Sequence, residues 1–171
     1  MATRWTLVGC LLVVCAPAFA ETGKAMIQGT AEGSPIAGTA IFADTDQGLH
    51  ITVQVAHVPP GLHGLHVHQF GSCQDAGKAA GGHYNPDEVK HGYLPKDGFM
   101  GAHAGDLGNI EIGPDGSGTL DLTLPDLSLN SELYNVGGRA VILHEKPDDF
   151  SQPTGNAGGR IGCGPILITG E

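Results

Sequence analysis

The feature that most constrains the fold of this chain is a regular alternation of apolar and polar residues over short stretches. Between residues 49 and 56, leucine, isoleucine and valine occupy every second position, and polar residues or alanine lie between them. Successive side chains of a strand project to opposite faces, so this pattern predicts a strand with one buried and one solvated face. The 28 glycines and 11 prolines of the 171 residues interrupt every apolar run before a long amphipathic helix could form.

Eight segments are predicted to be strands, and no long helix is predicted. The segments are 25–31, 36–43, 49–56, 64–68, 107–112, 119–124, 139–144 and 161–169. About eight short strands without helices predict an all-β sandwich or barrel formed by one domain. The segment 125–136 is ambiguous, because its pattern fits a loop or a helical turn.

Two stretches lack any periodicity and are predicted to be long loops, 69–102 and 145–159. An irregular stretch as long as the first is uncommon in a compact domain and usually indicates function or disorder. Because it contains Cys73, His83 and His91, we expect it to be functional.

The first 20 residues are predicted to be a signal peptide. Arg4 supplies a positive start, Trp5–Val14 is apolar, and Ala18–Ala20 has the small-residue form of a cleavage site. The apolar run is too short for a membrane-spanning helix. We therefore expect an exported protein, most simply periplasmic, whose mature domain is 21–171 and has no membrane segment.

Cleavage would leave only two of the four cysteines. Cys10 and Cys15 lie in the leader, and Cys73 and Cys163 remain. In an exported chain such a pair predicts one disulfide, and its closed loop of roughly 90 residues is worth roughly 4–5 kcal/mol. A lipid anchor at Cys15 is the alternative, and bulky Val14 argues against it.

The mature chain is strongly acidic. Without Arg4 it has seven lysine and arginine residues against 18 acidic ones, a formal net charge of −11. No basic run occurs, so the composition argues against nucleic acid or an anionic membrane surface as a partner.

Histidines provide the first indication of chemistry. The stretch Gly61–His68 holds three of the nine histidines, and His66 and His68 would project from the same face of a strand toward one metal ion. Imidazole suits zinc, copper, iron or nickel, so this spacing does not name the metal. The other candidate ligands are His83, His91, His103 and His144. His63 is expected to orient the strand, and His50 and His57 are expected to be ordinary surface residues.

Taken in order, six motifs resemble the copper/zinc superoxide dismutases, and the two long loops are similar to the exported bacterial branch of that family. The motifs are GLHGLHVH at 61–68, GGHYNP at 81–86, KHG at 90–92, HAGDLGN at 103–109, GGRAVILHEKPDD at 137–149 and GNAGGRIGCG at 155–164. The resemblance covers nearly the whole mature chain. It implies an eight-stranded Greek-key β-barrel with two long functional loops.

The resemblance also implies two metal sites that share one ligand. The copper site would comprise His66, His68, His83 and His144, and the zinc site would comprise His83, His91, His103 and Asp106. Asp148 would hydrogen-bond a copper histidine and a zinc histidine, with the adjacent Asp149 as the alternative. Arg160 would position the superoxide anion, and steering lysines are to be sought among Lys78, Lys90, Lys96 and Lys146.

The implied activity is the disproportionation of superoxide into dioxygen and hydrogen peroxide, with His83 and Arg160 as catalytic residues and copper and zinc as cofactors. The resemblance leaves the oligomeric state open between a monomer and a homodimer. The rival hypothesis is a non-catalytic metal-binding protein or metallochaperone on the same barrel. Such proteins usually lack a ligand or the arginine, and neither is missing here.

Overall fold

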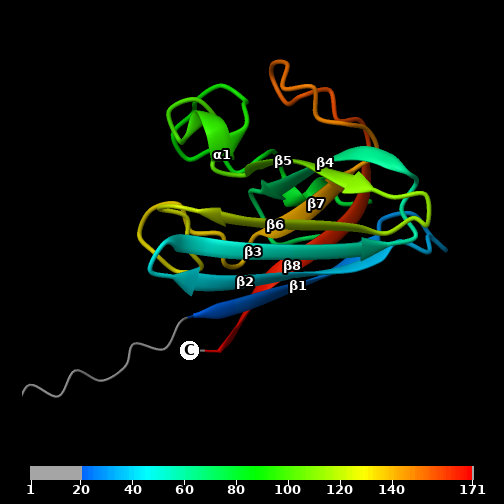
Figure 1. The fold of residues 1–171 in the computed structure, drawn as a ribbon, viewed down its shortest axis with the longest axis horizontal. Helices are drawn as coiled ribbons and strands as arrows, with labels where there is room; N and C mark the ends of the chain where they lie inside the picture. The colour runs from blue at the N-terminus through cyan, green and yellow to red at the C-terminus, as the bar shows by residue number, and fades with distance from the viewer. Residues whose placement is uncertain (1–20, 171) are drawn as a thin grey trace, which may run out of the picture.

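The computed structural model describes residues 21–170, and these form an all-β barrel (Figure 1). The strands are β1 (Thr22–Gly29), β2 (Ala37–Thr45), β3 (Gly48–Ala56), β4 (Gly61–His68), β5 (Asp106–Ile112), β6 (Gly118–Leu124), β7 (Ala140–His144) and β8 (Arg160–Gly170). The only helical pieces among the described residues are η1 (Lys78–Ala80) and α1 (Leu94–Asp97). The predicted fold class is confirmed, and each predicted strand matches an observed one within a few residues.

All strand pairs are antiparallel, and the barrel closes in the order β1-β2-β3-β6-β5-β4-β7-β8. Two connections cross the barrel. β4 follows β3 in the sequence but is separated from it by β6 and β5, and β7 follows β6 but pairs with β4 and β8. These crossings give the expected Greek-key topology.

The core is built as the alternation predicts. On β3, Leu49, Ile51, Val53 and Val55 are buried, and the residues between them reach the outer face. His50 is one of these outer residues, and its ring lies 3.1 Å from the carboxylate of Asp121 on β6. The expectation that His50 belongs to a solvated strand face is confirmed.

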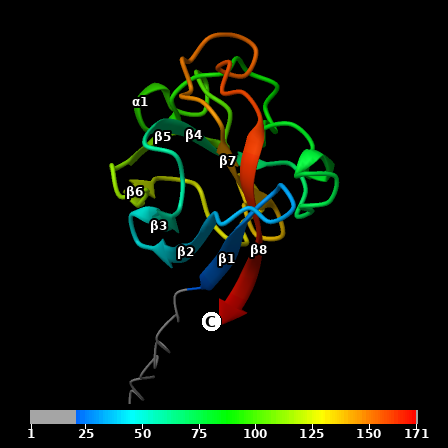
Figure 2. The same cartoon turned by 90° about the vertical axis from the view of Figure 1, so that its right-hand side faces the viewer.

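β4 and β7 differ from the other strands because both of their faces are covered. Every residue from His63 to His68 and from Ala140 to His144 is buried. One face points into the core, and the other is covered by the loops 69–105 and 145–159. Figure 2 shows both loops (green and orange) over the side of the barrel where β4, β5 and β7 lie. Polar side chains on the covered face are thereby withdrawn from water without entering the apolar core.

The predicted disulfide between Cys73 and Cys163 is present, with Cα atoms 5.7 Å apart. It fastens the loop after β4 to β8. Cys163 packs in a small apolar cluster with Ala80, Ala140 and Ile142.

The ambiguous segment 125–136 contains no helical turn. It is a loop in which Ser128 and Asn135 form an isolated bridge, and Leu127, Leu129 and Val136 are buried. Among residues 21–170, no helix is long and apolar enough to cross a membrane. The predicted signal peptide, residues 1–20, lies outside the described residues.

Candidate metal centre

The covered face of β4 and β7 carries a cluster of four buried histidines. His66 and His68 project from the same face of β4, His144 ends the neighbouring β7, and His83 comes from the loop. One ring nitrogen of each lies within 4.8 Å of the others, and Nε2 of His68 is 3.3 Å from Nε2 of His144. Four neutral imidazoles at this spacing can hold one metal ion.

A second buried cluster combines His83, His91, His103 and Asp106. Asp106 Oδ1 lies 2.8 Å from His83 Nδ1 and 3.1 Å from His103 Nδ1, and Asp106 Oδ2 lies 2.8 Å from His91 Nδ1. The two nitrogens of His83 and His103 are 3.4 Å apart. Asp106 starts β5, and the three histidines all come from the loop before it.

The second cluster fits zinc. Ligand atoms about 2.0–2.1 Å from a tetrahedral zinc stand about 3.3–3.4 Å from one another. The measured separations of 2.8–3.4 Å are close to this value. Moreover, His91 Nδ1 is buried and makes no hydrogen bond, although Asp106 Oδ2 is 2.8 Å away. The lone pair of His91 Nδ1 is therefore not directed at the carboxylate, and it is available to bind a metal ion.

His83 belongs to both clusters. Its Nδ1 faces Asp106 and His103, and its ring centroid is 4.1 Å from that of His66 and 5.0 Å from that of His68. An imidazole has two nitrogens on opposite edges of the ring. A single ring can therefore contact both sites, and the two sites then lie on opposite edges of the His83 ring.

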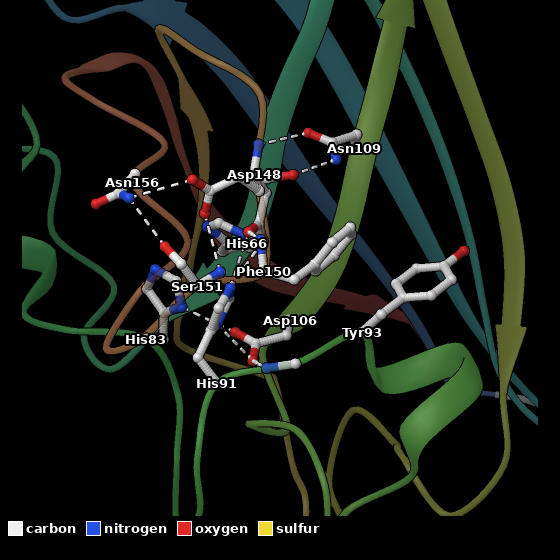
Figure 3. Close-up of polar contacts among 12 residues, drawn as sticks. His66, His83, His91, Tyr93, Asp106, Asn109, Asp148, Phe150, Ser151 and Asn156 are labelled. Carbon is white, nitrogen blue, oxygen red and sulfur yellow. Dashed lines mark hydrogen bonds and ion pairs between the residues drawn. The ribbon is translucent and has the colours of Figure 1, made fainter.

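Asp148 links the two clusters, because its carboxylate contacts one histidine of each (Figure 3). His66 Nε2 lies 2.8 Å from Asp148 Oδ2, and His91 Nε2 lies 2.9 Å from Asp148 Oδ1. These three residues are close enough to form a metal site themselves. However, each ring uses Nε2 on the carboxylate, and within residues 21–170 the two buried side-chain atoms without a hydrogen bond are the Nδ1 atoms of His66 and His91. The carboxylate thus orients both rings so that Nδ1 faces the clusters.

Asp148 is itself fixed in place. Asn109 on β5 holds its backbone twice, since Asp148 N donates to Asn109 Oδ1 (2.7 Å) and Asn109 Nδ2 donates to Asp148 O (2.9 Å). Phe150 N donates to Asp148 Oδ1. Asp149 is exposed and accepts hydrogen bonds from Ser151 and Asn156 instead.

The remaining ring nitrogens face backbone carbonyls. His68 Nδ1 lies 3.0 Å from Gly81 O, and His144 Nδ1 lies 3.5 Å from Gly158 O. The ring of His63 is buried between the carbonyls of Pro59 and His144, at 2.8 Å from each, and belongs to neither cluster. His50 and His57 also lie outside both clusters.

The electrostatics of the first cluster favour the unprotonated rings that bind metals. Burial lowers the pKa of His68 to about 2, of His144 to about 3 and of His83 to about 4. Neighbouring imidazoles contribute to the same lowering of the pKa, since a charge on one ring disfavours a charge on the next. At neutral pH, these three rings are neutral and available to a metal.

The second cluster contains an ionised carboxylate, which the first cluster lacks. Burial opposes the charge of Asp106, but its close contacts with the rings of His103, His83 and His91 outweigh burial and hold the pKa of Asp106 well below its ordinary value. His91 shows the reverse balance. Burial lowers its pKa, whereas Asp106 and Asp148 together raise it to about 9. A metal ion at this site would displace the proton that His91 otherwise carries.

A cavity of about 200 Å³ opens over the first cluster. Its lining includes His68, His83, His144, Thr154, Asn156 and Arg160. The guanidinium of Arg160 donates to Gly77 O (2.5 Å) and Gly81 O (2.6 Å), so the loop closed by the disulfide fixes its position. A larger groove on the outer face of β1, β2, β3 and β6 has no titratable residue in its lining.

Some residues of the site were not singled out by the sequence. Gln152 holds the backbone of His91, accepting from its N–H at 3.1 Å and donating to its carbonyl at 2.8 Å. Gly155 packs so closely that a Cβ there would overlap the carboxylate of Asp148. Asn109 falls within the motif HAGDLGN and could have been found there, whereas nothing local marks Gln152.

Comparison with known proteins agrees with this geometry. The family described as "Copper/zinc superoxide dismutase (SODC)" matches residues 36–166. "Superoxide dismutase [Cu-Zn] 2" of Brassica juncea is 41% identical over 143 residues, which cover 79% of this chain and 91% of that protein. The crystal structure of the clock protein EA4 superposes with a TM-score of 0.76 at 32% identity, covering 91% of this chain and 99% of that one.

The curated relative is a plant protein, so the assignment to the exported bacterial branch stays a prediction. The family itself is shown by the match over most of the chain and by two histidine clusters able to bind its metals. The chain belongs to the copper/zinc superoxide dismutase family, and it is an oxidoreductase that acts on superoxide with copper and zinc as cofactors.

Proposed function

We propose that His66, His68, His83 and His144 hold the copper and that His83, His91, His103 and Asp106 hold the zinc. The observation that carries this assignment is the orientation of the two buried Nδ1 atoms of His66 and His91, which make no hydrogen bond and face different clusters. The first set is all imidazole, which suits copper, and it lines a cavity. The second set includes a carboxylate and is closed, which is typical of a structural zinc.

When bound, copper supplies one-electron chemistry by alternating between two oxidation states. The net reaction consumes two superoxide anions and two protons and yields one dioxygen and one hydrogen peroxide. The chain has to provide a site for the anion, a source of protons and a rigid ligand set.

Arg160 is the group we assign to the anion. It lines the cavity beside His68, His83 and His144, and its guanidinium keeps N–H donors beyond the two that bind Gly77 and Gly81. A fixed positive charge in a cavity attracts a small anion even when the protein as a whole is acidic. Lys146 packs beside Gly158, another residue of the cavity lining, and is the candidate steering lysine that we assign to this cavity.

His83 is the group we assign to proton transfer. Its ring lines the cavity, so when the nitrogen opposite Nδ1 is not bound to copper, a proton on that nitrogen would lie next to the bound anion. Asp106 and His103 hold Nδ1 and keep the ring in place. A ring held in this way can release a proton to the peroxide and regain one from solvent without moving.

The deciding experiment is superoxide consumption by the protein loaded with both metals. We expect fast consumption that His83→Ala abolishes together with the magnetic coupling between copper and zinc. Full metal content without superoxide consumption would instead support the metal-buffer hypothesis.

We further propose an antioxidant role outside the cytoplasm. The predicted signal peptide 1–20 and the disulfide support it, since disulfides persist in oxidising compartments. Cell fractionation and N-terminal sequencing test this role. A cytoplasmic protein that keeps Met1 would refute it.

A further inference from the structure

The loop between β6 and β7 touches the loop that carries His91 and His103, at a point outside both metal clusters. Residues 125–139 are called the strap below. Figure 1 shows this part of the chain in yellow, at the same end of the barrel as α1. The strap supplies no metal ligand, and its contacts with the neighbouring loop have no part in the mechanism described above.

Tyr134 makes the main contacts. Its ring stacks on that of Phe99, with centroids 3.7 Å apart and planes at 14°, and its hydroxyl donates to Asp87 Oδ2 at 2.7 Å. Asp87 precedes His91 in the sequence and Phe99 follows it. One side chain therefore joins the two arms of the loop on either side of a zinc ligand.

The hydroxyl of Tyr134 is a persistent donor. Its hydrogen bond to Asp87 raises the pKa of Tyr134 above the ordinary value, so the proton stays in place at neutral pH. The backbone of Tyr134 has a φ of 52°, which is unfavourable for a residue with a bulky side chain. The hydrogen bond from Ser128 N to Tyr134 O holds the turn in this conformation.

The strap is firmly attached to the barrel. Leu127, Leu129 and Val136 are each at most 1% exposed and belong to the main core. Leu129 N donates to the carboxylate of Asp44 on β2 at 3.1 Å. Because these attachments involve no metal ligand, the strap can hold its shape in the metal-free protein.

Arg139, at the end of the strap, provides a second contact. Its guanidinium carbon lies 3.5 Å from the centroid of the Tyr84 ring, and its NH1 donates to Gln69 O at 2.8 Å. Tyr84 is buried and adjoins His83. The strap therefore contacts the loop near its start through Arg139 and on both sides of His91 through Tyr134.

We propose that Tyr134 is a positioning residue for the zinc site, which holds the loop around His91 in its metal-binding shape before the metal binds. This inference rests on the proposed function, because it takes the second cluster as the zinc site. A loop that is already ordered loses less conformational freedom when it binds a ligand, so its affinity is higher. The 94–105 region has only the short helix α1 as regular structure, so contacts with the strap add order to that of its few local backbone hydrogen bonds.

The test is a double-mutant cycle between Tyr134→Phe and Asp87→Ala in the full mature protein. The primary readout is the zinc dissociation constant, measured by competition with a chelator. Tyr93→Phe is the matched control. It also deletes a tyrosine hydroxyl from this loop, but the hydroxyl of Tyr93 makes no hydrogen bond within the described residues. Copper affinity and amide exchange of Gly98, Gly101 and Ala102 in the metal-free protein are measured in parallel.

We expect Tyr134→Phe to weaken zinc binding about three- to tenfold, since one hydrogen bond to a carboxylate is lost at an exposed position. Asp87→Ala should have a similar effect, and the double variant should be no weaker than the single ones. Tyr134→Ala, which also loses the aromatic stack, should weaken zinc binding about 10- to 100-fold. Copper affinity and the Tyr93→Phe control should change less than about twofold, whereas amide exchange in the loop should accelerate in step with the zinc effect.

The proposal is overturned if Tyr134→Ala leaves both zinc affinity and loop exchange within about twofold of the unaltered protein. It is also overturned if the effects of Tyr134→Phe and Asp87→Ala simply add, or if copper affinity falls as much as zinc affinity. Failure of the proposed function has a different signature. In that case His103→Ala would not weaken zinc binding, and amide exchange in the metal-free protein would still decide whether Tyr134 orders the loop.

Discussion

Replacing both disulfide cysteines by alanine should destabilise this protein strongly. Cys73 and Cys163 are 90 positions apart, and a cross-link of that span removes a large part of the conformational freedom of the unfolded chain. The chain-entropy relation gives about 4.6 kcal/mol at 25 °C for a loop of roughly 90 residues. In a domain of about 150 residues, this corresponds to a fall in Tm of about 10–18 °C.

The structure indicates that the local packing adds little to this figure. Cys163 is 3% exposed and touches only a small cluster with Ala80, Ala140 and Ile142, so alanine leaves a small void there. The larger local effect should fall on the active site. The loop that the disulfide fastens carries the carbonyls of Gly77 and Gly81 that hold Arg160, so kcat/KM should fall even where the protein remains folded.

The measurement is urea unfolding of the metal-free chain 21–171, followed by far-UV circular dichroism because the only tryptophan, Trp5, lies in the predicted leader. The free energy of unfolding and its urea dependence (the m-value) are compared between the unaltered protein and the double alanine variant. The unaltered protein in excess reductant serves as an independent check. A loss below about 1 kcal/mol with an unchanged m-value would refute the reasoning, since it would mean that the cross-link does not constrain the unfolded state.

Three further predictions concern the metal centre. Arg160→Ile should lower kcat/KM for superoxide while metal content stays full, and an unchanged rate at low salt would remove Arg160 from the mechanism. Asp148→Asn should weaken zinc binding about 10- to 100-fold, because the variant loses the negative charge and replaces one of the two accepting oxygens near His66 and His91 with an NH₂ donor; an unchanged dissociation constant would contradict its orienting role. In the metal-free protein, stability should fall as the pH drops from about 6.5 toward 4. In the folded state the pKa values of His68, His83 and His144 are lowered, so only the unfolded chain takes up their protons in that window. His91 acts in the opposite direction, because its raised pKa contributes stability below 6.5 that is lost as the pH rises through about 9. A lower urea midpoint at pH 7 than at pH 5 would refute this balance.

Much of the fold followed from local pattern. The alternation at 49–56 predicted both the strand β3 and its buried face, because the two-residue period of a strand is a property of the backbone alone. The pair His66 and His68 was predicted to share a face for the same reason, and it does. The local pattern of the segment 125–136 is ambiguous, since its structure depends on burying Leu127, Leu129 and Val136 against strands far away in the sequence.

The orientation of the site was not predictable from local pattern. Which nitrogen of His66 faces the cluster is decided by Asp148, and the backbone of His91 is held by Gln152. These partners lie 82 and 61 positions away from the residues they orient. A contact at such a distance leaves no periodic trace along the chain.

The sequence by itself therefore determined the strand content of this protein, the candidate ligands and, through its six motifs, the family. The resemblance to that family also implied how the ligands divide into two sets that share His83. The tertiary structure alone decided which ring nitrogens face the two clusters, and that the strap reaches the zinc loop through Tyr134. The reason is physical. Backbone periodicity is local and can be read from neighbouring residues, whereas ring orientation and loop order arise from hydrogen bonds and packing that exist only after the barrel has closed.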